Sequence, residues 1–250
     1  MMRPFLISLG VLLLFFSYGQ KPLDQAFKAE RLRYRKVSFD ILRVKDASVL
    51  DFVSRNGDKK VFSNFKALEG SVPRSGNKKL LFATNGGIFE PDFSPSGLYI
   101  EHTQTHQKLN QSEGKGNFYL KPNGVFYIGE TEKNILSTQA FARAKPKCQH
   151  AIQSGPMLVI EGKIHPKFRE ASPNKYVRSG VGIDQQGEII FAISNQPVNF
   201  YHFASLFEER LACPNALYLD GAISQMYLPV LGREEEGRPY GSIIAIWGEK

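Results

Sequence analysis

The sequence predicts one α+β domain that is rich in strands and hairpins and contains few helices. A chain of 250 residues with 42% hydrophobic and 12% aromatic residues is long and apolar enough to bury a sizeable core. Its 22 glycines and 14 prolines indicate many turns. Short aromatic and β-branched runs recur between these turn residues, which is typical of strands. We find no repeat, low-complexity block or linker.

The first 19 residues read as a secretory signal peptide. Arg3 precedes an apolar run from Phe5 to Phe16, and the small residues Ser17 and Gly19 follow it. This run is short for a membrane span, which needs about 20 apolar residues; a retained N-terminal anchor is the alternative. We expect cleavage after Gly19 and an exported protein, periplasmic or secreted, without stable membrane insertion.

Beyond the signal peptide, we expect residues 20–36 to form a leader or short helix and residues 37–250 to form the domain. Residues 37–41 alternate between apolar and polar and predict a strand. The compact apolar run at 79–84 predicts a buried strand that ends in a turn. We also expect a helix over 23–31, a segment at 47–53 paired with the strand at 37–41, and a short helix over 62–68.

The second half of the chain predicts hairpins and one packed helix. Two aromatic runs flank Pro122-Asn123-Gly124 and predict a hairpin over 118–128. Apolar residues recur at helical spacing between 202 and 211, which predicts a helix on the sheet. The remaining expectations are a helix over 139–144 with Ser137 or Thr138 as its N-cap, hairpins over 157–164 and 182–191, and a final strand over 243–247.

Charge and cysteine content limit the partners and the compartment. Lys and Arg number 32 against 24 Asp and Glu, and this net charge of +8 favours anionic partners. The positive charges are scattered rather than gathered in a stripe, so no nucleic-acid binding is indicated. Cys148 and Cys213 form a candidate disulfide in an oxidising compartment. Two buried free thiols are the alternative.

Four segments combine polar residues with glycine beside a strand-like run. The sequence contains no P-loop, no Gly-x-Ser-x-Gly and no His-Glu-x-x-His. Glycine lets a backbone approach a ligand closely, and the polar side chains would fix the ligand's orientation. If the strand ends converge, they form a polar pocket; four separate tight turns are the alternative. The segments are Asn85-Gly86-Gly87-Ile88-Phe89, Gln153-Ser154-Gly155-Pro156, Arg178-Ser179-Gly180-Val181-Gly182 and Asp220-Gly221-Ala222-Ile223-Ser224.

With these segments the chain resembles the phosphodiester glycosidase domain family, in its compact bacterial secreted branch. A lysosomal uncovering enzyme of that family carries an Asp-Gly-Gly-Gly-Ser turn, in which Ala222 and Ile223 here replace two glycines. Ile223 narrows the space over the turn, so the resemblance supports the reaction class better than the substrate. The matching stretches lie within residues 37–248, at 83–89, 96–99, 116–119, 153–158, 178–183 and 219–224.

The resemblance implies hydrolysis of a sugar-1-phosphodiester in an exported or cell-envelope glycan. Arg178 is the candidate phosphate ligand, because a guanidinium can hold two phosphate oxygens at once. Asp220 is the candidate acid/base or nucleophile. Glu101 is the candidate second carboxylate, and Asp184 is expected to end its strand at a turn. The other expected substrate contacts are Asn85, Gly86, Gly87, Ser154, Gly155, Gly221 and Ser224.

Two other functions stay open from the sequence. One is a general phosphodiesterase that breaks the P–O bond, and the other is a non-catalytic carbohydrate-binding protein on the same scaffold. No cofactor and no metal site are predicted. Metal dependence stays undetermined, because Asp220, Glu101 and Asp184 could supply oxygen ligands to a divalent cation. The expected partner is a glycan or sugar-phosphate substrate.

Overall fold

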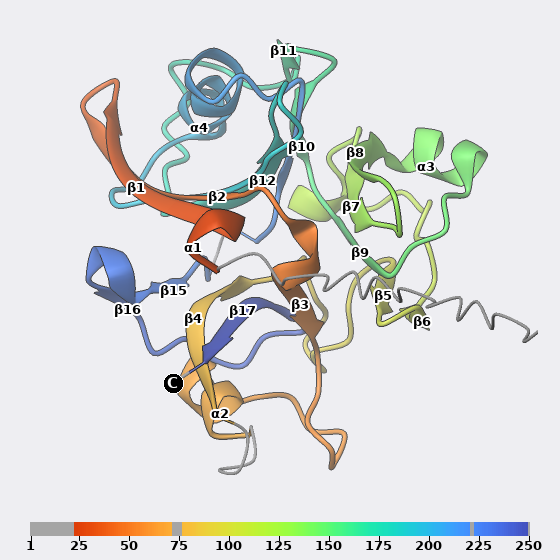
Figure 1. Ribbon diagram of the computed structural model, residues 1–250. Helices are drawn as coiled ribbons and strands as arrows, with labels where there is room; N and C mark the ends of the chain where they lie inside the picture. Colours follow the sequence, from red (N-terminus) through yellow and green to blue (C-terminus); the bar gives the residue numbers. More distant parts are fainter. Residues whose placement is uncertain (1–22, 72–76, 221–222, 250) are drawn as a thin grey trace, which may run out of the picture.

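Three antiparallel sheets form the framework of the chain (Figure 1). The computed structural model describes residues 23–71, 77–220 and 223–249. The first sheet has the strand order β1-β2-β13-β12-β14-β10-β11, the second β16-β15-β4-β17-β3, and the third β6-β5-β9-β7-β8. In Figure 1 the first sheet lies at the top left beside α4, the second below it, and the third at the right.

The bounds of the elements are as follows. The first sheet contains β1 (Phe27–Tyr34), β2 (Val37–Val44), β10 (Met157–Ile160), β11 (Lys163–Ile164), β12 (Ser179–Ile183), β13 (Ile189–Ser194) and β14 (Asn215–Tyr218). The second contains β3 (Leu50–Val53), β4 (Lys78–Asn85), β15 (Met226–Leu228), β16 (Arg233–Glu234) and β17 (Ile243–Glu249). The third contains β5 (Tyr99–Glu101), β6 (Gln104–Gln107), β7 (Gly124–Ile128), β8 (Lys133–Ser137) and β9 (His150–Ser154).

The helices between the strands are short. The α-helices are α1 (Leu23–Ala26), α2 (Phe65–Gly70), α3 (Thr138–Ala144) and α4 (Phe200–Ser205). A π-helix, η3 (Leu206–Arg210), continues α4, and the 3-10 helices are η1 (Ala47–Val49), η2 (Asn117–Tyr119) and η4 (Pro229–Leu231). Among the described residues, no helix has both the length and the apolar character needed to cross a membrane.

One apolar core joins the three sheets. Phe191 of the first sheet lies 5.3 Å, between ring centroids, from Phe82 of the second and 6.1 Å from Phe126 of the third. Phe52 of the second sheet also lies 5.9 Å from Phe126. Because these rings are fully buried, their removal from water stabilises the junction. The junction therefore fixes how the strand ends of the three sheets lie relative to one another.

Most of the predicted elements are confirmed, including the strand-rich α+β class. The strands at 37–41, 79–84 and 243–247 lie in β2, β4 and β17, and the hairpins at 157–164 and 182–191 form β10–β11 and β12–β13. Both predicted helices of the second half are present. Ser137 caps α3 by accepting from the Ala140 N–H, and the apolar side chains of α4 and η3, such as Phe203 and Phe207, pack on the first sheet.

The helix predicted over 23–31 is present only as α1 (Leu23–Ala26), because residues 27–34 form the edge strand β1. The proposed signal peptide lies outside the described residues, but the sheet begins at Phe27 rather than at residue 37. Charged residues of β1 obscured its strand pattern in the sequence. Arg31 faces Asp40 of β2 directly and pairs with it at 2.6 Å, so the charges of this strand are part of the strand pairing.

Two other pairings expected from the sequence are also wrong. The segment at 47–53 does not pair with β2, because residues 47–49 form η1 and β3 pairs with β17. The 118–128 hairpin is absent from the described structure, since β7 pairs with β8 and β9 and residues 117–119 form η2. Asn123 is buried there and bonds to Phe118 O and the Thr138 hydroxyl, so it anchors a loop instead of forming a turn tip.

The candidate disulfide between Cys148 and Cys213 is not formed, and both thiols are free. Cys213 is buried under the first sheet among Phe207 and its neighbours. Cys148 packs instead against the apolar cluster of the third sheet. Burial raises the pKa of Cys148 to about 11 and that of Cys213 to about 12. The two residues therefore stabilise different parts of the fold as apolar side chains.

Candidate functional site

Four strand ends from the three sheets converge on one hydrogen-bonded group. The strand-end cluster consists of Asn85, Ser154, Ser179, Asp220 and Ser224. Asn85 ends β4 of the second sheet, Ser154 ends β9 of the third, Ser179 begins β12 of the first, and Asp220 follows β14 of the first. The convergence predicted from the polar-glycine segments is therefore present, and the alternative of four separate turns does not describe it.

Ser179 is the hub of this cluster. Its hydroxyl donates to Asn85 Oδ1 at 3.1 Å, and its N–H donates to Ser224 Oγ at 2.9 Å. The Ser224 hydroxyl in turn donates to the backbone carbonyl of Asp220. Ser154 closes the cluster on the opposite side by donating to the carbonyl of Leu219. The Ser224–Asp220 bond closes the turn after β14, and the other bonds join it to different chain segments, so together they hold the backbone that carries Asp220.

The glycines of the cluster allow close packing of backbones. A Cβ on Gly86 would lie 2.1 Å from Ser242 Oγ, and one on Gly155 would lie 2.7 Å from Asn123 Cβ. A Cβ on Gly87 would lie 2.7 Å from Ile152 Cγ2. The Gly86 N–H donates to Ser242 O at 2.8 Å, so this backbone group is satisfied within the protein. Gly221, another expected contact, lies outside the described residues.

Arg178 is held beneath the cluster, with a side chain that is only 1% exposed. Its Nε donates to Val198 O at 2.8 Å and its Nη2 donates to Asn174 Oδ1 at 2.8 Å. The guanidinium carbon lies 3.8 Å from the centre of the Phe200 ring, in cation–π geometry. Burial lowers the pKa of Arg178, but arginine stays charged in proteins. The chain thus keeps a positive charge in its interior at this point.

The phenol of Tyr218 links this charge to Asp220. Arg178 Nη1 donates to the Tyr218 hydroxyl at 2.9 Å. Burial raises the pKa of Tyr218, the guanidinium opposes that rise, and the nearby charge of Asp220 adds to it. Both terminal nitrogens of Arg178 therefore have protein acceptors, and the two-point phosphate contact expected from the sequence is not available in this arrangement.

Asp220 is half-buried, and its charge also affects a second tyrosine. Tyr240 is buried, and burial together with the charges of Glu235 and Asp220 raises its pKa. The Tyr240 hydroxyl donates to Gln225 Oε1 at 2.6 Å, and the Gln225 N–H donates to Asn85 Oδ1 at 3.2 Å. Asp220 thus lies near two buried tyrosines. Tyr218 accepts from Arg178, and Tyr240 is joined to the cluster through Gln225.

The other two carboxylates named from the sequence have different surroundings. Glu101 Oε2 accepts from Ser54 Oγ and from the Tyr99 hydroxyl, both at 2.9 Å. Asp184 follows β12 at the end remote from Ser179. As expected, it lies at a turn, where it accepts hydrogen bonds from backbone N–H groups between β12 and β13. Neither has a bond to the strand-end cluster among these contacts. Within the described ranges, no three His, Cys, Asp or Glu side chains are placed to hold a metal.

A cavity of about 430 Å³ opens beside the cluster. Ser224, Gln225 and Ile223 form its inner side, and the exposed Arg238 lies at its rim. Tyr176, which is 53% exposed, offers its ring to the same cavity. Larger cavities exist elsewhere, but they contain none of the cluster residues. Ser224 lines this cavity and donates to the Asp220 carbonyl, so its connection to the cluster, rather than its size, identifies it as the candidate substrate site.

Sequence reasoning missed several residues of this site. Tyr218 had a usable signal, because it lies two residues before Asp220 and so points to the same side of an extended chain. Ser179 lay inside a recognised segment but received no role. Tyr240 and Arg238 belong to a loop with no strand or helix pattern, and only the folded chain brings Arg238 to the cavity and Tyr240 near Asp220.

Known proteins share both the sequence and the fold of this chain. It is 42% identical over 164 residues to the uncharacterized protein YigE of Escherichia coli K12, a match that covers 66% of this chain but only 64% of the relative. The catalytic domain of zebrafish N-acetylglucosamine-1-phosphodiester α-N-acetylglucosaminidase, auto-inhibited by its pro-peptide, has a similar fold. It matches with a TM-score of 0.60 and 17% identity over 88% of this chain and 81% of that one.

A protein of Burkholderia pseudomallei K96243 named as exported also has a similar fold. The TM-score is 0.52 at 10% identity, and the match covers 84% of this chain and 74% of that one. At such identities the solved structures show the fold alone. The sequence comparison is more specific, because the family model described as phosphodiester glycosidase matches residues 78–247, which include every residue of the strand-end cluster. The chain therefore belongs to the phosphodiester glycosidase family.

Proposed function

We propose that this chain is an exported hydrolase that cleaves a sugar-1-phosphodiester at the bond between the anomeric carbon and oxygen. Its substrate is a phosphodiester in an exported or cell-envelope glycan. Family membership supports the hydrolase class. The observation that carries the proposal is the position of Asp220, which is half-buried and whose backbone carbonyl accepts from Ser224, a residue that lines the 430 Å³ cavity.

Asp220 acts as base or nucleophile at the anomeric carbon. Water supplies the hydroxyl that this carbon gains, and the proton of that water leaves through Asp220. The phosphomonoester departs with the electron pair of the broken C–O bond. Since the second pKa of a phosphomonoester is about 6, this leaving group needs no full protonation. One carboxylate is then enough, whereas ordinary glycosidases use two, and Glu101 needs no direct part in the step.

Arg238 and Tyr176 are the substrate-binding residues at the mouth of the cavity. Arg238 is exposed, so its guanidinium can bind both non-bridging oxygens of a phosphodiester, which share one negative charge. The Tyr176 ring offers an apolar face to the C–H face of a sugar. Arg178 acts from below as a positioning residue, because it reaches Asp220 through Tyr218 and is closed to solvent.

Hydrolysis in water labelled with heavy oxygen tests this proposal. The substrates are α-linked sugar-1-phosphodiesters, and mass spectrometry locates the label in the two products. Label in the sugar supports C–O cleavage. Label in the phosphomonoester overturns the proposal in favour of a phosphodiesterase. Sugar binding without turnover, retained in Asp220→Asn, identifies a carbohydrate-binding protein instead.

A further inference from the structure

Two cavities remote from the strand-end cluster adjoin along η1. One, of about 950 Å³, lies between the first and third sheets, and the other, of about 630 Å³, extends towards the end of β17. Asp46 and Ser48 line both cavities, so together they form one groove, here called the η1 groove. It shares no lining residue with the cavity beside Asp220.

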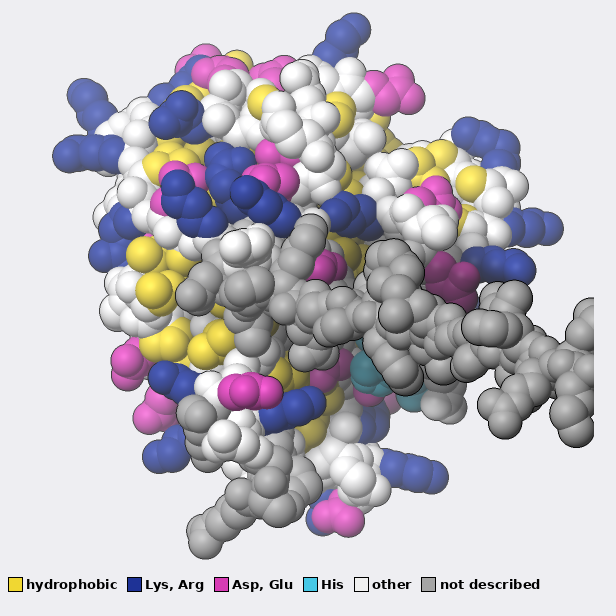
Figure 2. Space-filling model, in the orientation of Figure 1, with side chains coloured by type: hydrophobic (Ala, Val, Ile, Leu, Met, Phe, Trp, Pro, Cys, Tyr) yellow, Lys and Arg dark blue, Asp and Glu magenta, His cyan; other side chains and the backbone are white. Residues whose placement is uncertain are grey.

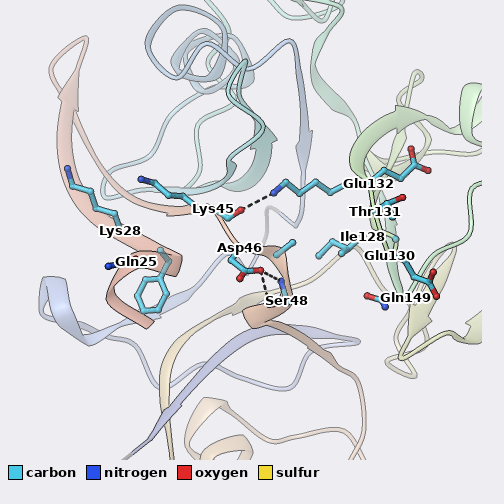
Figure 3. A pocket seen from close by; sticks show the side chains of 14 residues that line it. Gln25, Lys28, Lys45, Asp46, Ser48, Ile128, Glu130, Thr131, Glu132 and Gln149 are labelled. Carbon is cyan, nitrogen blue, oxygen red and sulfur yellow. Dashed lines mark hydrogen bonds between the residues drawn. The ribbon is translucent and has the colours of Figure 1, made fainter. Parts of the chain in front are cut away.

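The walls of the larger part of the groove come from separate sheets (Figure 3). Gln25 and Lys28 belong to the α1–β1 side, and Thr131 lies in the β7–β8 turn on the opposite side, with Gln149 just before β9. The Lys133 ammonium crosses between the walls and donates to Lys45 O at 3.1 Å. This hydrogen bond joins the two walls, and positive and negative side chains lie side by side on this face of the molecule (Figure 2).

The groove does not share the positive net charge of the whole chain. The chain carries a net +8, but the groove has four lysines against five carboxylates. This balance gives an anionic ligand no electrostatic advantage here, unlike at Arg238. The lysines are Lys28, Lys45, Lys78 and Lys133, and the carboxylates are Asp46, Asp51, Glu130, Glu132 and Glu249.

The remaining lining is suited to a ligand with many hydroxyl groups. The amides of Gln25 and Gln149 both donate and accept, as do the hydroxyls of Ser48 and Thr131. At the far end, Trp247 offers an indole whose N–H donates to Asp51 Oδ2 at 2.9 Å, which fixes the ring. A sugar presents hydroxyls for the polar groups and a C–H face for an aromatic ring.

We propose that the η1 groove is a second glycan-binding site that holds a neutral segment of an oligosaccharide. Each part of the groove lies within the volume of about 300–1,000 Å³ that accommodates a single ligand of drug size. The two parts together therefore have room for several linked sugars. This binding does not depend on hydrolysis at Asp220, and it would hold a glycan on the protein while a phosphodiester reacts at the other site.

Fluorescence of Trp247 tests the proposal directly, because it is the only tryptophan in the chain. The protein, expressed from its full coding sequence and purified as the cell releases it, is titrated with cellohexaose, maltohexaose, chitohexaose and an isomaltohexaose. We expect a saturable change with at least one of them, and an affinity that falls about tenfold or more for the matching disaccharide. No saturable change with any hexasaccharide, or an equal change with inorganic phosphate, overturns the proposal.

Paired variants locate the binding. Gln149→Ala and Thr131→Ala are expected to weaken the hexasaccharide about tenfold each, while Gln104→Ala, at an exposed glutamine of β6, leaves its affinity unchanged. Asp220→Asn also leaves this affinity unchanged, even if it abolishes hydrolysis. If Asp220→Asn weakens the hexasaccharide and Gln149→Ala does not, the sugar binds at the strand-end cluster and the proposal is overturned.

Discussion

The hydroxyl of Tyr218 accepts a hydrogen bond from Arg178 at 2.9 Å and lies close enough to Asp220 for that carboxylate to raise the pKa of the phenol. A buried cation is thereby connected to the candidate catalytic carboxylate through one side chain. Both Tyr218 and Arg178 are closed to solvent, so we expect them to position the site rather than to touch the substrate. Substitutions of Tyr218 or Arg178 should therefore change kcat, whereas substitutions of residues that touch the substrate should change KM.

Tyr218→Phe should lower kcat and leave KM nearly unchanged. The substitution keeps the ring but leaves Arg178 Nη1 without that acceptor. Hydrogen bonds to charged groups contribute about 1.5–3 kcal/mol, which corresponds to a loss of roughly 10- to 100-fold in rate. Steady-state kinetics on a sugar-1-phosphodiester measure both constants. Tyr127→Phe, at a buried tyrosine of the third sheet, is the control. An unchanged kcat in Tyr218→Phe would exclude the link to Asp220.

Arg238→Gln should show the opposite kinetic pattern. Its guanidinium lies at the rim of the cavity and is exposed, so its loss removes binding without disturbing the core. We expect KM for a phosphodiester to rise about 10- to 100-fold, as for the loss of a charge-assisted hydrogen bond, with little change in Tm. Arg169→Gln, at another exposed arginine, serves for comparison. Equal KM values in the two variants would remove Arg238 from the phosphate site.

His150 should make the fold less stable in mild acid. Burial, together with the nearby His102, lowers the pKa of His150 to about 4, whereas the unfolded chain has a value near 6.5. Between these values only the unfolded state takes up the proton, so the free energy of unfolding decreases as the pH falls from 6.5 to 4. The full loss is about 3 kcal/mol.

Urea unfolding at several pH values measures this effect. His150→Gln should reduce the decrease between pH 6.5 and 4, to which His165 also contributes because burial lowers its pKa too, whereas His106→Gln, at an exposed histidine, should not. A further loss of stability at lower pH is expected from Asp40. Burial alone would raise the pKa of Asp40, but hydrogen bonds from Arg31, Arg233 and Asn195 lower it overall. A His150→Gln curve parallel to that of the parent would contradict the assignment.

The two cysteines should resist thiol reagents in the folded protein. Their pKa values of about 11 and about 12 leave almost no thiolate at pH 8, and Cys213 is closed to solvent as well. A colorimetric thiol assay is expected to count almost none in the native state and two in urea without reductant. No thiols in urea would show a disulfide, which the separate clusters around Cys148 and Cys213 oppose.

The sequence predicted the parts of the fold and site that depend on local pattern. Regular alternation located β2, and the polar-glycine segments located the strand ends that meet at Ser179. The sequence-based predictions were wrong where contacts between residues far apart in the chain determine the structure. The charged strand β1 is stabilised by pairing of Arg31 with Asp40, and Asn123 is a buried anchor although its neighbours read as a turn. The burial of Arg178 likewise depends on Phe200 and Asn174, which no local pattern reveals.

Sugar release by Asp220→Asn, compared with Asp184→Asn, tests the central claim most directly. Both variants exchange one carboxylate for an amide at the end of a strand of the first sheet, but only Asp220 belongs to the strand-end cluster, whose Ser224 lines the cavity. We predict that the parent and Asp184→Asn release sugar from an α-linked sugar-1-phosphodiester at similar rates, and that Asp220→Asn is slower by about 10²- to 10⁴-fold with its fold intact. Release by Asp220→Asn at the parental rate would contradict the account and place the reaction elsewhere in the chain.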